Sequence, residues 1–350
     1  MKIFMVHENP WYAGNPYIYT LIEGLWNLNP EIIVAWGRDL FWNDRIFSYD
    51  IVHFHWPQAF MNGDRHSETE LRLHIEEMKR RGLKIVATCH DLEPHYDQCS
   101  QYRESMEIVY SHCDAIFHLG DYSKNLFEKK YPHIKHFILP PHIYDTVYTF
   151  RPSRDISLKH LGLSTKYTYI LCFGTFRADV ERELVINTYR QLKDLKIAVL
   201  APGFMDITAR RRSIKGILQR LKKEYYQYRY HIICSGRTWN SIPEEEVPYY
   251  YGAADVALIH RLKILNSGNA YLPLLFKKIV VGPDTGNVGS ILKSWGLPVF
   301  DTKSLKSVGD ALRRGLILSK EQFADNKYEQ LTTLYSTKRI VKELYYILVG

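Results

Sequence analysis

Short apolar runs alternate with segments of helical periodicity along the whole chain, and this alternation constrains the fold more than any other feature. The runs of a first series lie at residues 2–7, 31–36, 50–56, 84–90, 115–120 and 136–141. Those of a second series lie at residues 167–174, 196–202, 230–236, 255–260, 277–283 and 298–301. Apolar strands that alternate with helices are typical of parallel sheets with both faces covered. The sequence therefore predicts an α/β protein with two doubly wound, Rossmann-like domains that face each other.

A polar, irregular stretch at residues 142–166, which contains Pro152, separates the two series. It predicts a linker, and a chain of 350 residues is long enough for two domains. We therefore expect one domain over residues 1–150 and a second over residues 151–330. The helical pattern of the last stretch continues to the terminus, so residues 331–350 are expected to form a terminal helix.

The composition fits a folded protein, with 46% hydrophobic and 24% charged residues. Cysteines are scattered and form no CxxC pair, which argues against a zinc site or a disulfide framework. The first residues lack the pattern of a secretory signal, and no run approaches the roughly 18 apolar residues of a spanning helix. These features favour a protein of the reducing cytoplasm.

Positive charge is concentrated in residues 209–230, which hold eight basic side chains against the single acid Glu224. Apolar residues recur there at spacings of three and four, which predicts an amphipathic helix. Two interpretations stay open: a helix that lies on an anionic membrane surface, or a solvated face over an ordinary core stripe. A nucleic-acid partner is not favoured, because no recognised binding module accompanies the segment.

Ligands of doubly wound folds bind at the carboxyl ends of the strands, so the loops after the strands are the candidate sites. In the second series these loops carry glycines and cations, at Gly174–Arg177, Gly236–Trp239, His260–Arg261 and Asn266–Asn269. Ser267 is a good helix N-cap, and the helix after it would direct amides and a positive dipole end at an anion. In the first series the loops carry His7, His55, His90 with Asp91, and His118. The sequence thus pairs a candidate diphosphate site with a candidate acid/base site.

Several segments, in this order and at this spacing, resemble the GT-B glycosyltransferases, most closely the family 4-like sugar transferases of bacterial polysaccharide assembly. These segments are Asn15–Tyr17, Asp50–Pro57, Thr88–His95, Phe173–Arg177, Ile242–Leu258 and Ser267–Leu292. The resemblance spans nearly the whole chain. It implies an acceptor-binding first domain, a nucleotide-sugar donor domain, and a terminal helix that crosses back onto the first domain.

The resemblance also implies residue roles. The donor-binding residues would be Gly14, Asn15, Gly174, Thr175, Arg177, Arg237, Asn266, Ser267, Gly268 and Asn269. Arg177 would stabilise the leaving diphosphate, while His90 and Asp91 would perform acid/base chemistry on the acceptor hydroxyl. The acceptor itself, a glycan or lipid-linked glycan, would contact His55, Trp56, His95 and His118. No DxD-like pair ends a strand, so we expect a metal-independent hexosyltransferase without cofactors, peripheral on the inner face of the membrane.

The chain departs from the family at two places. Val180 stands where the family has a lysine, with Arg182 as a possible substitute. Asn266 or Ser267, and Gly289 or Ser290, stand where many members have glutamates. Two alternatives therefore stay open: a non-catalytic nucleotide-sugar-binding partner subunit, and a nucleotide-sugar epimerase of the same fold, which would need acidic residues in its site.

Overall fold

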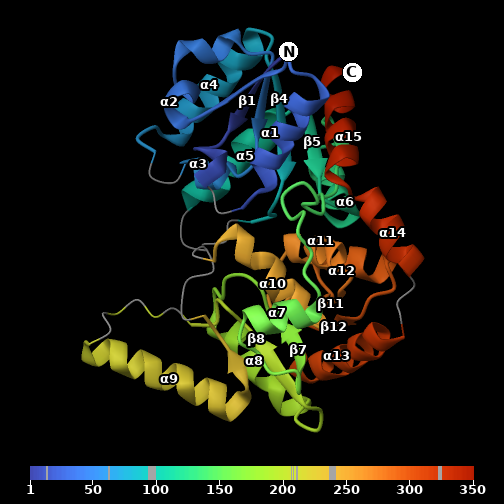
Figure 1. Ribbon diagram of the computed structural model, residues 1–350. Helices are drawn as coiled ribbons and strands as arrows, with labels where there is room; N and C mark the ends of the chain where they lie inside the picture. Colours follow the sequence, from blue (N-terminus) through green and yellow to red (C-terminus); the bar gives the residue numbers. More distant parts are fainter. Residues whose placement is uncertain are drawn as a thin grey trace. The chain divides into compact units, whose positions relative to one another are not determined.

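The computed structural model describes residues 1–12, 15–61, 64–93, 100–205, 207, 209, 212–235, 242–321 and 325–350. The chain divides into two compact units (Figure 1). The first unit comprises Met1–Val147 and Tyr335–Gly350, and the second comprises Tyr148–Leu334.

A six-stranded parallel sheet with the order β2-β1-β3-β4-β5-β6 forms the centre of the first unit. Its strands are β1 (Lys2–Val6), β2 (Ile33–Trp36), β3 (Ile51–Phe54), β4 (Lys84–Cys89), β5 (Ala115–His118) and β6 (Lys135–Ile138). The four interior strands β1, β3, β4 and β5 are buried almost throughout, as the continuous apolar runs predict. Because the strands are parallel, the loops after β1, β3 and β4 emerge at one edge of the sheet.

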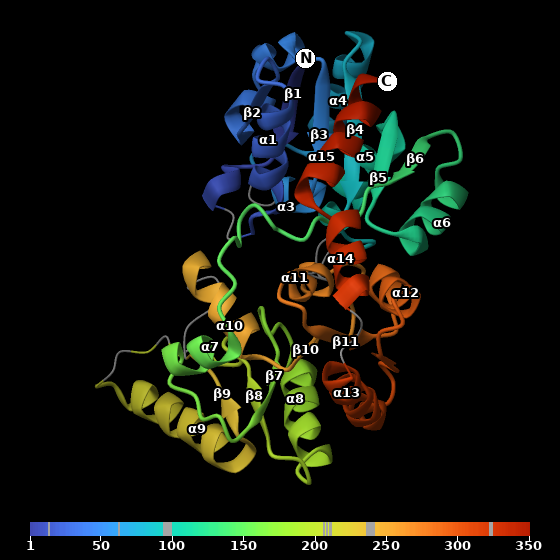
Figure 2. The same ribbon diagram turned by 45° about the vertical axis from the view of Figure 1, so that its right-hand side comes forward.

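Helices cover both faces of this sheet. They are α1 (Tyr17–Leu28), α2 (Arg38–Phe41), α3 (Pro57–Met61), α4 (Glu68–Arg80), α5 (Ser100–His112), α6 (Asp121–Lys130) and α15 (Thr337–Val349). Helix α4 begins with a capping box in which Ser67 and Glu70 exchange hydrogen bonds. Figure 2 shows α1 and α15 on the near side of the strands and α4 and α5 beyond them.

The second unit contains another six-stranded parallel sheet, with the order β12-β11-β10-β7-β8-β9. Its strands are β7 (Thr168–Leu171), β8 (Ile197–Leu200), β9 (Ile232–Ile233), β10 (Val256–Leu258), β11 (Ile279–Pro283) and β12 (Val299–Phe300). Its α-helices are α7 (Arg154–His160), α8 (Asp179–Gln191), α9 (Ile214–Tyr230), α10 (Val247–Ala253), α11 (Gly268–Leu275), α12 (Gly286–Ser294), α13 (Leu305–Lys320) and α14 (Asp325–Leu334). The prediction of two doubly wound sheets is confirmed.

The structure differs from the predicted secondary structure in two places. The predicted linker contains helix α7, which begins after the N-cap Ser153 and packs closely against Gly252 of α10. Its seven residues are too few to show a helical period. The terminal stretch is two helices rather than one, since α14 ends at Leu334 and Ser336 occupies the N-cap position of α15.

The C-terminal helix belongs to the first unit, as predicted for a helix that crosses back. Helix α15 packs against α1, where Gly24 faces Val341. Its start is held by Asp145, whose carboxylate accepts hydrogen bonds from the Thr337 amide at 2.9 Å and the Thr337 hydroxyl at 2.5 Å. Among the described helices, none has both the length and the apolar character needed to cross a bilayer.

Candidate functional site

A cluster of histidines lies at the carboxyl ends of β3 and β4 in the first unit. These neighbouring strands pair Phe54 with Ala87, which brings the following residues together. The Nδ1 atom of His55 lies 3.1 Å from Nε2 of His90, and the Trp56 ring stacks on the His90 ring with centroids 3.9 Å apart. Three residues that the sequence assigns to acceptor binding and catalysis therefore meet in one place.

Burial keeps these histidines neutral. It lowers the pKa of His55 and of His90 well below the usual range, and the neighbouring ring of His53 lowers both further. Burial lowers the pKa of His53 to about 3. A neutral imidazole has one donor and one acceptor nitrogen, so one of the facing His55 and His90 nitrogens donates to the other. Such a pair can accept a proton and share the resulting charge.

Several buried polar atoms of this cluster have no hydrogen-bond partner among the described residues. They include His7 Nδ1, the Tyr17 hydroxyl, His53 Nδ1 and His55 Nε2. The Tyr17 ring meets the His90 ring edge to face, with centroids 5.4 Å apart, and His7 lies against Trp56. An unsatisfied buried polar group costs about 1–3 kcal/mol, so several together are typical of a site that a polar ligand completes.

The other candidates of the first unit lie in different surroundings. Burial raises the pKa of the Cys89 thiol and of the Tyr110 hydroxyl, and the nearby charge of Asp91 raises both further. Both ring nitrogens of His118 bond within the unit, at 3.2 Å from Ser123 Oγ and 2.9 Å from His136 Nδ1, which leaves neither for a ligand. Asn15 accepts from the Tyr17 amide at 3.1 Å and so helps to start α1. Gly14 and His95 lie outside the described residues.

In the second unit, hydrogen bonds with the residues after β10 and with α8 hold the loop after β7 in place. The Thr175 carbonyl accepts from Arg261 at 2.9 Å and from His260 at 3.3 Å. The buried Glu181 accepts the Arg177 amide at 2.7 Å, and Arg261 lies 3.7 Å from its other oxygen. Sequence reasoning missed Glu181, because its capping pattern begins with Ala178 rather than with Ser or Thr.

The side chain of Arg177 is exposed on this fixed loop. No hydrogen bond or ion pair to another described residue holds its guanidinium, which is therefore available to an anion. Arg182, by contrast, bonds to the carbonyls of Phe176 and Phe204 and to Asp179. Arg182 thus holds the loop and is not a free substitute for the family's lysine.

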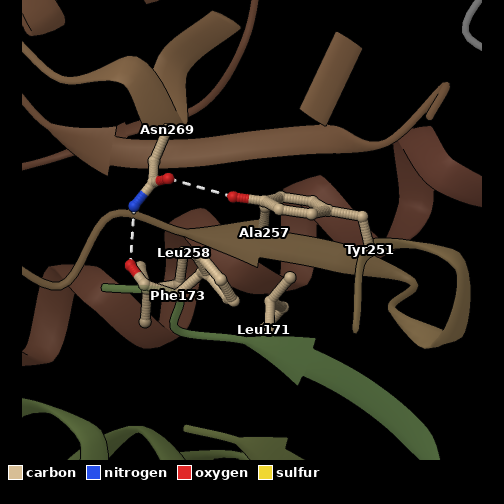
Figure 3. A pocket seen from close by; sticks show the side chains of 6 residues that line it. All are labelled: Leu171, Phe173, Tyr251, Ala257, Leu258 and Asn269. Carbon is tan, nitrogen blue, oxygen red and sulfur yellow. Dashed lines mark hydrogen bonds between the residues drawn. The ribbon is translucent and has the colours of Figure 1, made fainter. Parts of the chain in front are cut away.

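The start of α11 follows the predicted turn. Ser267 Oγ accepts the Asn269 amide at 3.2 Å, which confirms the N-cap. The Asn269 side chain donates to the Phe173 carbonyl at 2.6 Å and accepts from the Tyr251 hydroxyl at 2.9 Å (Figure 3). Asn269 therefore ties three segments together, and its amide and side chain are already used. Of the predicted donor amides in this turn, that of Gly268 is the better candidate.

The space around Asn269 is closed. It is lined by Leu171, Phe173, Tyr251, Ala257, Leu258 and Asn269 and leaves no volume in which a water molecule fits. This space is a packing feature that fixes the β7 loop against α11, and we do not assign it to a substrate.

The turn before α11 and the turn before α12 are bonded to each other. The Leu265 carbonyl accepts the Asn287 and Val288 amides at 2.9 and 3.2 Å, and Asn266 Oδ1 accepts from the Asn287 side chain at 2.8 Å. Gly286 allows this approach, because a Cβ there would lie 2.7 Å from the Ile264 carbonyl oxygen. The Asn287 and Val288 amides of α12 are therefore already bonded, which favours the α11 side for the predicted anion site.

Two predictions remain, the donor-binding role of Arg237 and the independence from a metal ion. Arg237 lies outside the described residues. Within the described ranges, no three or more His, Cys, Asp or Glu side chains are grouped so that they could hold a metal ion.

The chain has matches among solved protein structures but none among family models or curated sequences. No protein-family model matches the chain, and no curated protein matches it in sequence. Sucrose-phosphate synthase from Thermosynechococcus elongatus aligns over 99% of this chain and 98% of its own, with a TM-score of 0.70 and 13% identity. HepE from Anabaena, solved with UDP and glucose, aligns over 100% of both chains, with a TM-score of 0.71 and 10% identity. A glycosyltransferase from Rickettsia africae covers 99% of this chain and 97% of its own, with a TM-score of 0.67 and 11% identity. The chain therefore has the GT-B fold, that of the glycosyltransferases which its sequence motifs resemble.

Proposed function

We propose that this protein is a glycosyltransferase that moves a hexosyl group from a nucleotide-sugar donor to a glycan or lipid-linked glycan acceptor in polysaccharide biosynthesis. The observation that carries the proposal is the neutral His55–His90 pair, surrounded by buried polar atoms without partners, at the carboxyl end of the first sheet. The fold supports it, since HepE of the same fold was solved with UDP-glucose.

The donor half of the proposal rests on Arg177. Its exposed guanidinium stands on a loop fixed by Glu181, Arg261 and His260, so it is positioned before the ligand arrives. A guanidinium fork suits a diphosphate, and a fixed cation stabilises the charge that builds on the leaving group. The Gly268 amide at the start of α11 would add a backbone donor, with Gly174, Thr175 and Asn266 bordering the same site. Arg177 would meet the leaving-group charge, so the transfer needs no metal.

The acceptor half rests on His90. An acceptor hydroxyl would transfer its proton to the neutral His90 ring as it attacks the sugar. His55 is almost completely buried and acts through its 3.1 Å contact with His90, so we assign it as a positioning residue. Trp56 and Tyr17 would border the acceptor. Asp91, His95, Gly14 and Arg237 keep their predicted roles as part of this proposal.

Release of nucleoside diphosphate from a panel of UDP-, GDP- and ADP-sugars tests the proposal, with and without acceptor glycans. Arg177→Ala should lower kcat about a hundredfold or more while the melting temperature stays unchanged. Arg314→Ala, which removes an exposed arginine from α13 of the same unit, is the matched control and should keep full activity. Equal activity of the Arg177 and Arg314 variants would remove Arg177 from the site.

His90 is tested by its pH profile. His90→Ala should lower kcat more than it changes the donor KM, because the ring acts in the chemical step. His55→Phe should shift the acid limb of the kcat profile, since it removes the hydrogen-bond partner of His90 Nε2. If His55→Phe lowered activity equally at every pH, His55 would be structural only.

The non-catalytic alternative is favoured by the lack of acidic side chains at Asn266, Ser267, Gly289 and Ser290 and by the exposed Val180. Nucleotide sugars would then raise the melting temperature without being consumed. A panel in which no nucleotide sugar shifts the melting temperature or releases diphosphate would reject both possibilities. Unchanged transfer in excess EDTA is expected for a metal-independent enzyme.

A further inference from the structure

Helix α9 lies at the rim of the second unit, beside the edge strand β9 (Figure 2). It packs against β9 and α8, and only Gly216 and Tyr230 of its residues are buried. Ser213 caps its start by accepting the Gly216 amide at 3.0 Å. The helix is therefore well formed although most of its surface faces outward.

The apolar stripe of α9 is on this outward surface. Its members are Ile214, Ile217, Leu218, Leu221, Tyr225 and Tyr228, and all are exposed. Leu218 and Leu221 are 60% and 61% exposed, and Tyr228 is 87% exposed. At about 100° per residue, these six positions span a face about 100° wide, opposite the buried Gly216 and Tyr230. The interpretation of the stripe as part of the core is therefore wrong.

Basic residues flank the stripe. Lys215, Lys222 and Arg229 recur every seven residues along one side of it, and Arg220 lies on the other side. Glu224 is the only acid of the helix. An exposed apolar stripe bordered by cations is the pattern of helices that lie in the interface of an anionic bilayer.

We propose that α9 docks this unit on an anionic membrane surface, with the stripe in the headgroup region and the flanking cations on lipid phosphates. A second copy of the chain fits the surface less well, because both borders of the stripe are basic and two stripes in contact would bring cations of the two copies together. A nucleic acid would meet an apolar centre instead of a basic one. The inference goes beyond sugar transfer and does not depend on it.

Sedimentation of the full chain with vesicles tests the proposal. The chain should bind vesicles of phosphatidylethanolamine and phosphatidylglycerol, bind phosphatidylcholine vesicles weakly, and be released by salt. Leu218→Glu with Leu221→Glu should reduce the partition coefficient at least about tenfold. Lys222→Ala with Arg229→Ala should reduce it about 25-fold on anionic vesicles, at about fivefold per cation, with little change on phosphatidylcholine.

Leu73→Glu is the matched control. Leu73 is 59% exposed on α4 of the first unit, and its replacement should leave vesicle binding unchanged. All these side chains are exposed, so circular dichroism should give wild-type melting for each variant. The proposal is overturned if the chain does not prefer anionic vesicles, if the double Leu variant binds like the wild type, or if α9 instead mediates dimers in analytical ultracentrifugation. Transfer to a water-soluble acceptor without vesicles should be equal in all variants, which separates this test from that of the proposed function.

Discussion

Gly286→Ala should destabilise the second unit through one defined steric contact. Gly286 has φ +56°, and a Cβ there would lie 2.7 Å from the Ile264 carbonyl oxygen and 2.9 Å from the Leu265 Cα. Gly162 has a similar φ of +63°, but its Cβ would meet nothing within 4 Å. In both variants the left-handed backbone costs about 1–2 kcal/mol, and a stiffer unfolded chain offsets about 0.4–1 kcal/mol of this. Only Gly286→Ala adds overpacking against backbone, about 1–3 kcal/mol.

Gly286→Ala should therefore be about 2 kcal/mol less stable than Gly162→Ala. For a unit of this size the difference amounts to about 4–8 °C in melting temperature. Denaturant unfolding followed by circular dichroism measures it, provided the m-values of the two variants agree. Because the contact holds the Leu265–Ser267 turn, Gly286→Ala should also weaken the thermal shift caused by the donor. Equal stability of the two alanine variants would refute the reasoning, since it would mean that the two turns are not in contact.

Three further predictions follow from the packing of the units. Gly24→Ala should lower the free energy of unfolding by about 1–3 kcal/mol, because the new Cβ would lie 2.5 Å from Val341 Cγ2. Val341→Ala should then destabilise the Gly24→Ala variant less than it destabilises the wild type, which a double-mutant cycle measures. Asn269→Ala should destabilise the second unit by about 1–3 kcal/mol, because the Phe173 carbonyl loses its donor. Tyr251→Phe removes only the other bond of the Asn269 side chain and should cost about 1 kcal/mol, so urea unfolding should rank the two variants in this order. Burial lowers the pKa of His142 from 6.5 to about 4, so the stability it contributes is complete above pH 6.5 and is lost as the pH falls to about 4. The loss due to His142 should reach about 3 kcal/mol, and His142→Phe should reduce the fall in stability over this pH range by that amount, while the other buried histidines keep theirs.

Much of the fold follows from local patterns. Strand β4 is predicted at residues 84–90 and lies at Lys84–Cys89, so its ends agree to within one residue, because an apolar run is a property of a short segment. Helix α7 was missed because seven residues carry little periodicity, and the division between α14 and α15 was missed because the apolar period continues across it. The sequence also predicts that His55, Trp56 and His90 meet, since parallel strands end at one edge.

The finer parts of the site could not be predicted in this way. The sequence predicts that the Asn269 amide binds the donor phosphate, whereas this amide donates to Ser267 Oγ and the side chain bonds to Phe173 and Tyr251. It presents His118 as an acceptor residue, whereas Ser123 and His136 use both of its nitrogens. In each case the partner is chosen by packing between elements, which periodicity does not report.

The sequence by itself determines that the chain forms two parallel α/β sheets, that histidines end the strands of one, and that glycines and cations end the strands of the other. Only the tertiary structure decides which polar atoms find partners, that the Arg177 side chain is exposed, and that the apolar stripe of α9 faces outward. The physical reason is the range of the interactions. Secondary structure depends on neighbours within a few residues, while burial and hydrogen bonding join residues as distant as Phe173 and Asn269, 96 positions apart.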